Sequence, residues 1–150
     1  LAGNHDRRHQ LLAVFPDTLV DSHGFVQCEI DCSAGRFLML DTVEEGKGWG
    51  SYCKKRLAWL RDALAKSQDQ KVYLFMHHPP FVTGIDGMDN QNLKNSSKFF
   101  EILKSYPNVK HIACGHVHRV TETVIEVFSG YEIYQADKLT HNGRPKCGSW

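Results

Sequence analysis

Ile112-Ala113-Cys114-Gly115-His116-Val117-His118 is an apolar run that ends in the pattern Gly-His-x-His. Side chains two positions apart on an extended segment point the same way and lie roughly 6.5 Å apart. Two imidazoles so arranged can share one metal ion, or each can hold one of two ions about 3.5–4 Å apart. An isolated His-x-His is more often a strand end with two solvated histidines. Here, Asn4-His5-Asp6 and His77-His78-Pro79-Pro80 offer the same ligand chemistry and favour a metal site.

Strand and helix patterns alternate on the way to this run. Residues 71–76 and 108–114 have the composition of buried β-strands, and residues 52–66 and 93–105 have the apolar spacing of helices. This order predicts an α/β layered domain. Functional residues of such sheets gather beyond the carboxyl ends of the strands, which is where all three candidate ligand stretches fall.

The clearest helix pattern covers residues 52–66. Three leucines recur at i, i+3 and i+7 and predict an apolar stripe that packs on the core: Leu57, Leu60 and Leu64. Arg56 is among the charged residues that lie off this stripe. Ser51 stands just before the helix and is a candidate N-cap.

Shorter elements are expected nearer the two ends of the chain. Residues 7–14 favour a short helix, and residues 24–30 and 36–41 favour an antiparallel hairpin. A second hairpin is expected within residues 121–134. Together these elements predict one domain over residues 1–140, followed by a loose polar tail at 141–150.

The bulk composition is that of an ordinary soluble globular protein. The 150 residues are 41% hydrophobic and 23% charged, with a formal net charge of +1. This charge provides no general field for a nucleic-acid polymer, and no apolar stretch reaches the roughly 20 residues that span a membrane. Five cysteines without a Cys-x-x-Cys pair favour reduced thiols, and therefore a cytoplasmic protein.

Four residues could form a metal site rich in nitrogen ligands: Asn4, His77, His116 and His118. One amide oxygen and three imidazoles suit Zn, Mn, Fe, Co or Ni better than Ca or Mg. A hydrolytic site of this kind needs Lewis acidity and an open position for the substrate. His5 would then be free to donate a proton, since an ordinary histidine has a pKa of about 6.5.

The order of these stretches resembles the calcineurin-like metallophosphoesterases. Gly3-Asn4-His5-Asp6, His77-His78-Pro79-Pro80 and Gly115-His116-Val117-His118 match the last three motifs of that family, over about residues 1–119. The segment at 79–89 resembles the branch of class III cyclic-nucleotide phosphodiesterases and glycerophosphodiesterases. The resemblance implies hydrolysis of a small phosphodiester by metal-bound hydroxide, with two divalent transition-metal ions (Mn, Fe, Zn or Co) in the complete enzyme.

The resemblance also implies roles for individual residues. Asn4, His77 and His116 match the ligands of the family's second metal ion, and His118 matches a ligand of the first. His5 matches the catalytic histidine at the phosphate and leaving group. His77 is preferred over His78 because the family's ligand stands two residues before a proline, but an assignment shifted by one residue stays open.

Three further residues are candidates for contact with the substrate: Asp6, Arg7 and His78. Asp6 and Arg7 adjoin His5, so they are close enough to touch the substrate or to orient that histidine. Both also fit a simple surface ion pair, which is the alternative reading of the same two letters.

The chain departs from the family at its beginning. The family's Asp-x-His and Gly-Asp-x-x-Asp motifs precede Gly-Asn-His-Asp, which here starts at Gly3. We therefore expect an N-terminally truncated domain with an empty first metal site and one metal ion or none. The alternative function is a non-catalytic fragment that binds at most one ion.

The resemblance predicts the C-terminal part of a four-layer α-β-β-α sandwich, mainly its second sheet and the flanking helices. One face of that sheet would lack its usual cover. We therefore expect the chain to form a homo-oligomer or to pair with a missing N-terminal segment.

Overall fold

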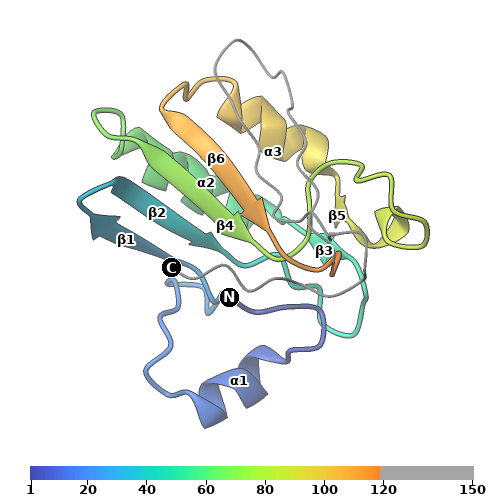
Figure 1. Cartoon of the computed structure of the whole chain (residues 1–150). Helices are drawn as coiled ribbons and strands as arrows, with labels where there is room; N and C mark the ends of the chain where they lie inside the picture. The colour runs from blue at the N-terminus through green and yellow to red at the C-terminus, as the bar shows by residue number, and fades with distance from the viewer. Residues whose placement is uncertain (119–150) are drawn as a thin grey trace, which may run out of the picture.

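A computed structural model describes residues 1–118 and contains a four-stranded sheet in the order β1-β2-β4-β6 (Figure 1). The strands are β1 (Cys28–Cys32), β2 (Gly35–Leu40), β4 (Val72–Met76) and β6 (Val109–Cys114). β2, β4 and β6 are parallel, and β1 runs antiparallel to β2 at the edge. The predicted α/β class and the predicted hairpin are confirmed. β1 begins at Cys28 rather than at residue 24.

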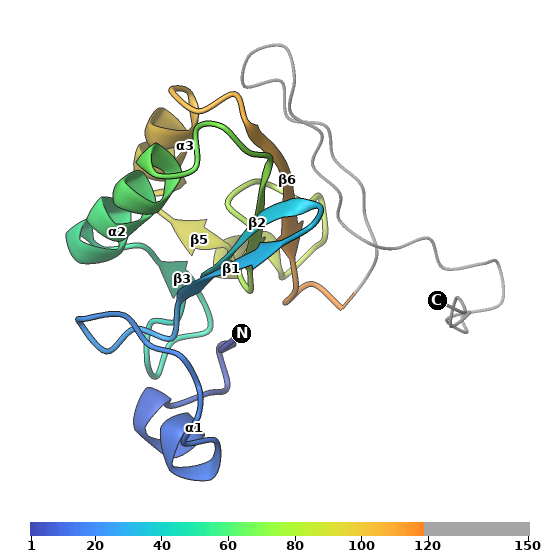
Figure 2. The same cartoon turned by 90° about the vertical axis from the view of Figure 1, so that its left-hand side faces the viewer.

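Two helices cover one face of this sheet. α2 (Lys54–Ala65) and α3 (Ser96–Leu103) lie together on the same side of the strands (Figure 2). The main core forms between them and the sheet, because alternate strand residues such as Leu38, Leu74 and Ile112 point toward the helices. The leucine stripe of α2 is part of this core, as predicted.

The start of α2 differs from the sequence prediction in two respects. Ser51 does not cap the helix; Cys53 occupies the N-cap position, and the Ser51 hydroxyl donates to Glu44 instead. Arg56 lies off the leucine stripe but is buried, with only 3% of its surface exposed. Its guanidinium donates to the backbone carbonyls of Asp41 and Val43, at 2.9 and 3.1 Å, so a second face of α2 is also covered.

The remaining elements lie at the carboxyl end of the main sheet (Figure 1). α1 (Arg8–Val14) forms where a short helix was predicted. β3 (Gly50–Ser51) and β5 (Leu93–Lys94) make a small parallel pair, and a 3-10 turn, η1 (Asp89–Gln91), precedes β5. The long segment between β4 and α3 therefore contains a helical turn and a short strand that pairs with β3.

Two sequence predictions fall outside the described residues: the hairpin within 121–134 and the tail at 141–150. Within residues 1–118, no helix is long and apolar enough to cross a membrane.

Candidate metal centre

Two neighbouring parallel strands, β4 and β6, bring the predicted histidines to the carboxyl end of the sheet. β4 ends at Met76, directly before His77, and β6 ends at Cys114, two residues before His116. Met76 and Cys114 are partners in the parallel register, and the Gly115 N–H donates to the Met76 carbonyl at 3.2 Å. Because the strands are parallel neighbours, the segments that follow β4 and β6 leave the sheet side by side.

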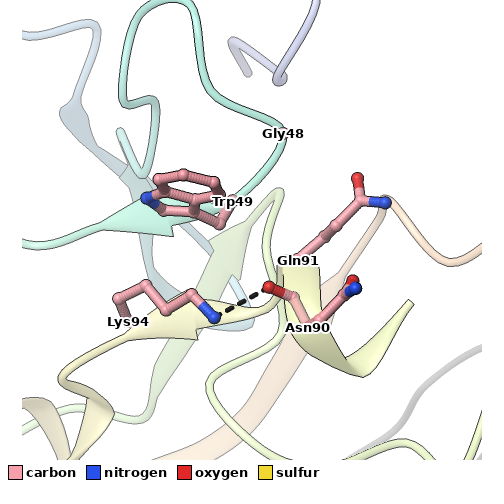
Figure 3. Close-up of a pocket in the computed structure, with 5 residues that line it drawn as sticks. All are labelled: Gly48, Trp49, Asn90, Gln91 and Lys94. Carbon is pink, nitrogen blue, oxygen red and sulfur yellow. Dashed lines mark hydrogen bonds between the residues drawn. The ribbon is translucent and has the colours of Figure 1, made fainter. Parts of the chain in front are cut away.

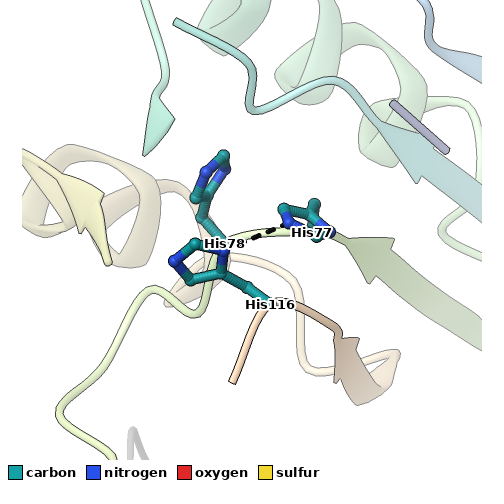
Figure 4. A group of neighbouring side chains, drawn as sticks. All are labelled: His77, His78 and His116. Carbon is teal, nitrogen blue, oxygen red and sulfur yellow. Dashed lines mark hydrogen bonds between the residues drawn. The ribbon is translucent and has the colours of Figure 1, made fainter. Parts of the chain in front are cut away.

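Three atoms that could bind a metal ion converge at this end of the sheet. His77 Nε2 lies 2.9 Å from Asn4 Oδ1 and 3.2 Å from His116 Nδ1. Asn4 comes from the N-terminal turn, so segments more than seventy residues apart in the sequence meet here. His78 completes the only group of three candidate metal ligands in residues 1–118, with ligand atoms of His77, His78 and His116 within 4.8 Å of one another (Figure 4).

The chemistry of this group fits a transition-metal ion. Buried polar atoms normally have a hydrogen-bond partner, yet Nε2 of His116 has none within the described part of the chain. Imidazole nitrogens and one neutral amide oxygen are ligands for zinc, manganese or iron-like ions. The set contains no carboxylate, so it does not resemble a calcium or magnesium site.

The histidines are held in the neutral form that metal binding requires. Burial, together with the neighbouring His116, lowers the pKa of His77 to about 4. Burial and the adjacent His77 lower the pKa of His78 to about 3. The pKa of His116 is also lowered, mainly by burial. At neutral pH, protons therefore do not compete for these nitrogens.

His78 has a position different from that of His77. Its side chain is completely buried, and its Nδ1 lies 2.8 Å from the Thr42 hydroxyl. Gly50 packs against the ring so closely that a Cβ there would lie 2.6 Å from His78 Cγ. A side chain enclosed in this way does not support the predicted contact between His78 and the substrate.

The Gly-His-x-His segment is not extended, which corrects the prediction for residues 116 and 118. Both histidines have left-handed backbones, with φ of 74° at His116 and 50° at His118. The strand ends at Cys114, so the alternation of side chains does not continue beyond it. His116 turns inward and is buried, whereas His118 is exposed and lies outside the three-histidine group.

The N-terminal turn places the other predicted residues beside Asn4. The Asp6 carboxylate accepts the Gly3 N–H at 2.7 Å and closes the turn that carries Asn4 and His5. His5 and Arg7 are exposed. They line a hollow of about 320 Å³ together with Asn4 and residues 46–48.

Asp41 is a structural residue of the site that the sequence prediction missed. Its buried carboxylate accepts from Arg8 Nε at 2.7 Å and Nη2 at 2.8 Å, and from the backbone N–H groups of Val26 and Val43. Arg8 directly follows the Asn4–Arg7 turn, so this ion pair fastens the turn to the end of β2. A single aspartate after a strand carries no motif, and its partner is distant in the sequence.

The letters Asp21-Ser22-His23 match Asp-x-His, but their position differs from that of the family motif, since they follow Gly-Asn-His-Asp. Asp21 accepts hydrogen bonds from the backbone N–H groups of His23 and Phe25. Its other carboxylate oxygen accepts from Gln27 Nε2 at 2.7 Å. The carboxylate therefore organises a turn and is not part of the three-histidine group.

The buried histidines predict that the metal-free chain loses stability in acid. His78 has a pKa near 6.5 when unfolded and about 3 when folded, so the unfolded state binds more protons between these values. The free energy of unfolding should fall as pH drops from 6 to 4, by up to about 1.4 kcal/mol per pH unit from this histidine. Urea titrations in EDTA measure this slope.

The variant His78→Asn should show a slope smaller by about one proton than that of the wild type. Equal slopes for the wild type and His78→Asn would contradict the assignment.

Comparisons with known proteins agree with this geometry. Residues 1–120 match the sequence profile of the calcineurin-like phosphoesterases. A probable glycerophosphodiester phosphodiesterase, GpdQ, of Arcobacter nitrofigilis is 37% identical over 126 residues, which are 83% of this chain and 46% of the relative. A probable cyclic nucleotide phosphodiesterase of Rhodopseudomonas palustris is 37% identical over 122 residues, covering 79% of this chain and 44% of the relative.

A solved structure has a similar fold at low sequence identity. The crystal structure of a dimetal phosphatase from Danio rerio aligns with 88% of this chain and 58% of its own, with a TM-score of 0.70 and 18% identity. The chain spans a little under half the length of the curated relatives it matches. The described residues thus have the fold of one part of a metallophosphoesterase domain, as expected.

The match over most of the sequence and the converging Asn4, His77 and His116 lead to one conclusion. The chain belongs to the calcineurin-like phosphoesterase family.

Proposed function

We propose that this chain supplies the Asn4, His77 and His116 metal site of a metal-dependent phosphodiesterase. The observation that carries the proposal is the convergence of one amide oxygen and two neutral imidazoles within 2.9 and 3.2 Å. The names of the relatives support hydrolysis of a phosphodiester as the reaction. The exposed hollow beside Asn4 supplies the opening that a small substrate needs.

A divalent transition-metal ion (Mn, Fe, Zn or Co) held by these residues would supply Lewis acidity at a phosphate oxygen. The resemblance to the family adds His118 as a ligand of the family's other metal ion, the one called the first above. His118 is exposed and free of the three-histidine group, so this assignment depends on donors beyond that group.

His5 is proposed as the general acid. It adjoins the ligand Asn4, is exposed, and lines the same hollow, so its imidazolium can donate a proton to the oxygen of the leaving group. Arg7 lines the hollow as well, and its guanidinium can bind phosphate oxygens in a bidentate manner.

Asp6 and His78 are proposed to position the site without touching the reacting atoms. Asp6 closes the turn that carries Asn4 and His5 through its bond to Gly3. The His78 ring packs edge-on against the His77 ring, with the centroids 4.9 Å apart, and Thr42 fixes its orientation. Loss of either contact would shift a proposed ligand.

We further propose that another copy of the chain, or a further segment, covers the sheet face that the helices of residues 1–118 do not cover. Phe37, Tyr73, Phe75 and His111 lie opposite the helices and form a chain of ring contacts with centroids 5.1 to 5.5 Å apart. They are only half-buried, although aromatic rings are usually covered in a folded core.

The test of the proposed function is hydrolysis of bis-p-nitrophenyl phosphate by the purified chain. We expect turnover that requires added Mn²⁺, disappears in EDTA, and falls in His5→Ala. Metal binding without turnover would favour the alternative, a non-catalytic metal-binding fragment. Neither metal binding nor turnover would refute both.

A further inference from the structure

Trp49 lines a second hollow, next to the proposed phosphodiesterase site. The hollow has a volume of about 500 Å³ and is bordered by residues from the loop before β3, from η1 and from β5: Gly48, Trp49, Asn90, Gln91 and Lys94 (Figure 3). This volume lies within the range of small-molecule sites, about 300–1,000 Å³. Trp49 is 37% exposed, unlike the aromatic side chains of the main core.

Two lysine ammonium groups lie close to the Trp49 ring. Lys47 Nζ lies 5.2 Å and Lys94 Nζ lies 5.9 Å from the ring centroid. Lys94 is held in place by its 2.7 Å bond to the backbone carbonyl of Asn90. An exposed indole with two ammonium groups within 6 Å of its centroid complements a ligand that is both planar and anionic.

The opposite wall of the hollow carries side-chain amides. Gln91 Nε2 donates to the Gly87 carbonyl at 3.3 Å, which leaves Oε1 available as an acceptor. Within residues 1–118, the side-chain amide of Asn90 has no hydrogen-bond partner. Figure 3 shows the two amides near each other, to the right of Trp49 and Lys94. Such groups bond to the edge of a nucleobase that stacks on an aromatic ring.

The two hollows share one residue. Gly48 borders the Trp49 hollow, and it also borders the hollow that contains Asn4 and His5. A Cβ at Gly48 would lie 2.8 Å from Gln91 Oε1, so a larger residue at this position would crowd the place where the two hollows meet. One ligand can therefore extend from His5 to Trp49.

We infer that Trp49 forms a base-binding subsite and that the substrate is a nucleoside phosphodiester. The base stacks on the indole, Asn90 and Gln91 bond to its edge, and the phosphate lies toward Lys47 and His5. The inference rests on the proposed function for the position of the phosphate. It separates nucleotide substrates from glycerophosphodiesters, which have no aromatic group to stack.

Binding to the full chain in EDTA tests the subsite without turnover. Isothermal titration calorimetry would compare 3′,5′-cyclic AMP with glycerophosphoethanolamine, which lacks a base. The variant Trp49→Leu should weaken binding of cyclic AMP by about 5- to 150-fold and leave glycerophosphoethanolamine unchanged. The variant Trp49→Phe, which keeps an aromatic face, should retain most of the affinity. Circular dichroism confirms that each variant is folded.

Tryptophan emission gives a second readout. Cyclic AMP should quench the emission of the wild type and of the control Trp59→Phe, whereas Trp49→Phe should bind without that quenching. No binding of cyclic AMP, or equal affinity in Trp49→Leu, would overturn the subsite. Binding through Trp49 without hydrolysis would support the subsite and count against the proposed phosphodiesterase activity alone.

Discussion

The variant His77→Ala should lose more than about 100-fold of the manganese-dependent rate on bis-p-nitrophenyl phosphate. His77 Nε2 is the central atom of the group, within 2.9 Å of Asn4 Oδ1 and 3.2 Å of His116 Nδ1. Removal of residues that merely orient a ligand typically costs 10- to 100-fold in metal affinity or activity, so the loss of a ligand itself should cost more. Initial rates over a range of Mn²⁺ concentrations measure the effect.

His9→Ala is the matched control for this variant. His9 lies on α1, is exposed, and belongs to no candidate site, so its loss should leave the rate within twofold of the wild type. The variant His78→Ala separates the two adjacent histidines, because His78 is proposed to position rather than to bind the metal. A larger loss of rate in His78→Ala than in His77→Ala would reverse the ligand assignment.

Replacement of Asp41 by asparagine should lower the free energy of unfolding by about 3–5 kcal/mol. The carboxylate is fully buried and accepts two hydrogen bonds from Arg8, at 2.7 and 2.8 Å. Arg56 Nη1 lies 3.7 Å from the same carboxylate. The amide of asparagine carries no negative charge, so both guanidinium groups lose their anionic partner. A buried charge without an opposite charge nearby destabilises the folded state. Chemical denaturation followed by circular dichroism measures the change.

An exposed aspartate–arginine pair in the same chain provides the control for Asp41. Asp31 accepts from Arg36 Nε at 2.7 Å, a distance equal to that of the buried pair, but its side chain is 67% exposed. The variant Asp31→Asn should therefore lower the free energy of unfolding far less than Asp41→Asn does, because solvent screens the exposed pair. Similar costs for the two variants would contradict the importance of burial at Asp41.

The sequence allowed the meeting of Asn4, His77 and His116 to be predicted because the relevant signals are local. Each buried strand is a short apolar run, and each run is followed directly by histidine-containing residues. Parallel strands then bring His77 and His116 to the same carboxyl end of the sheet. The position of Asn4 followed from the resemblance of Gly-Asn-His-Asp to a family motif rather than from any periodic pattern.

The features that were not predicted depend on contacts between distant segments. Asp41 and Arg8 are 33 residues apart, and neither stands in a motif that marks it as buried. Arg56 has the spacing of an exposed residue, but the segment around Val43 covers it. The predicted conformation of the Gly-His-x-His segment was wrong because it assumed an extended backbone beyond Cys114, where the strand ends. The Trp49 hollow lies between residues 48–49 and residues 90–94, and no sequence pattern links these two segments.

The measurement that tests the metal site most directly is the number of Mn²⁺ ions bound at equilibrium by the purified chain. Dialysis against Mn²⁺ followed by elemental analysis gives this number for the wild type and for Asn4→Ala. The site formed by Asn4, His77 and His116 predicts close to one ion per wild-type chain and a clear loss in Asn4→Ala. A wild-type chain that retains no more Mn²⁺ than the dialysis buffer contains would contradict the metal site.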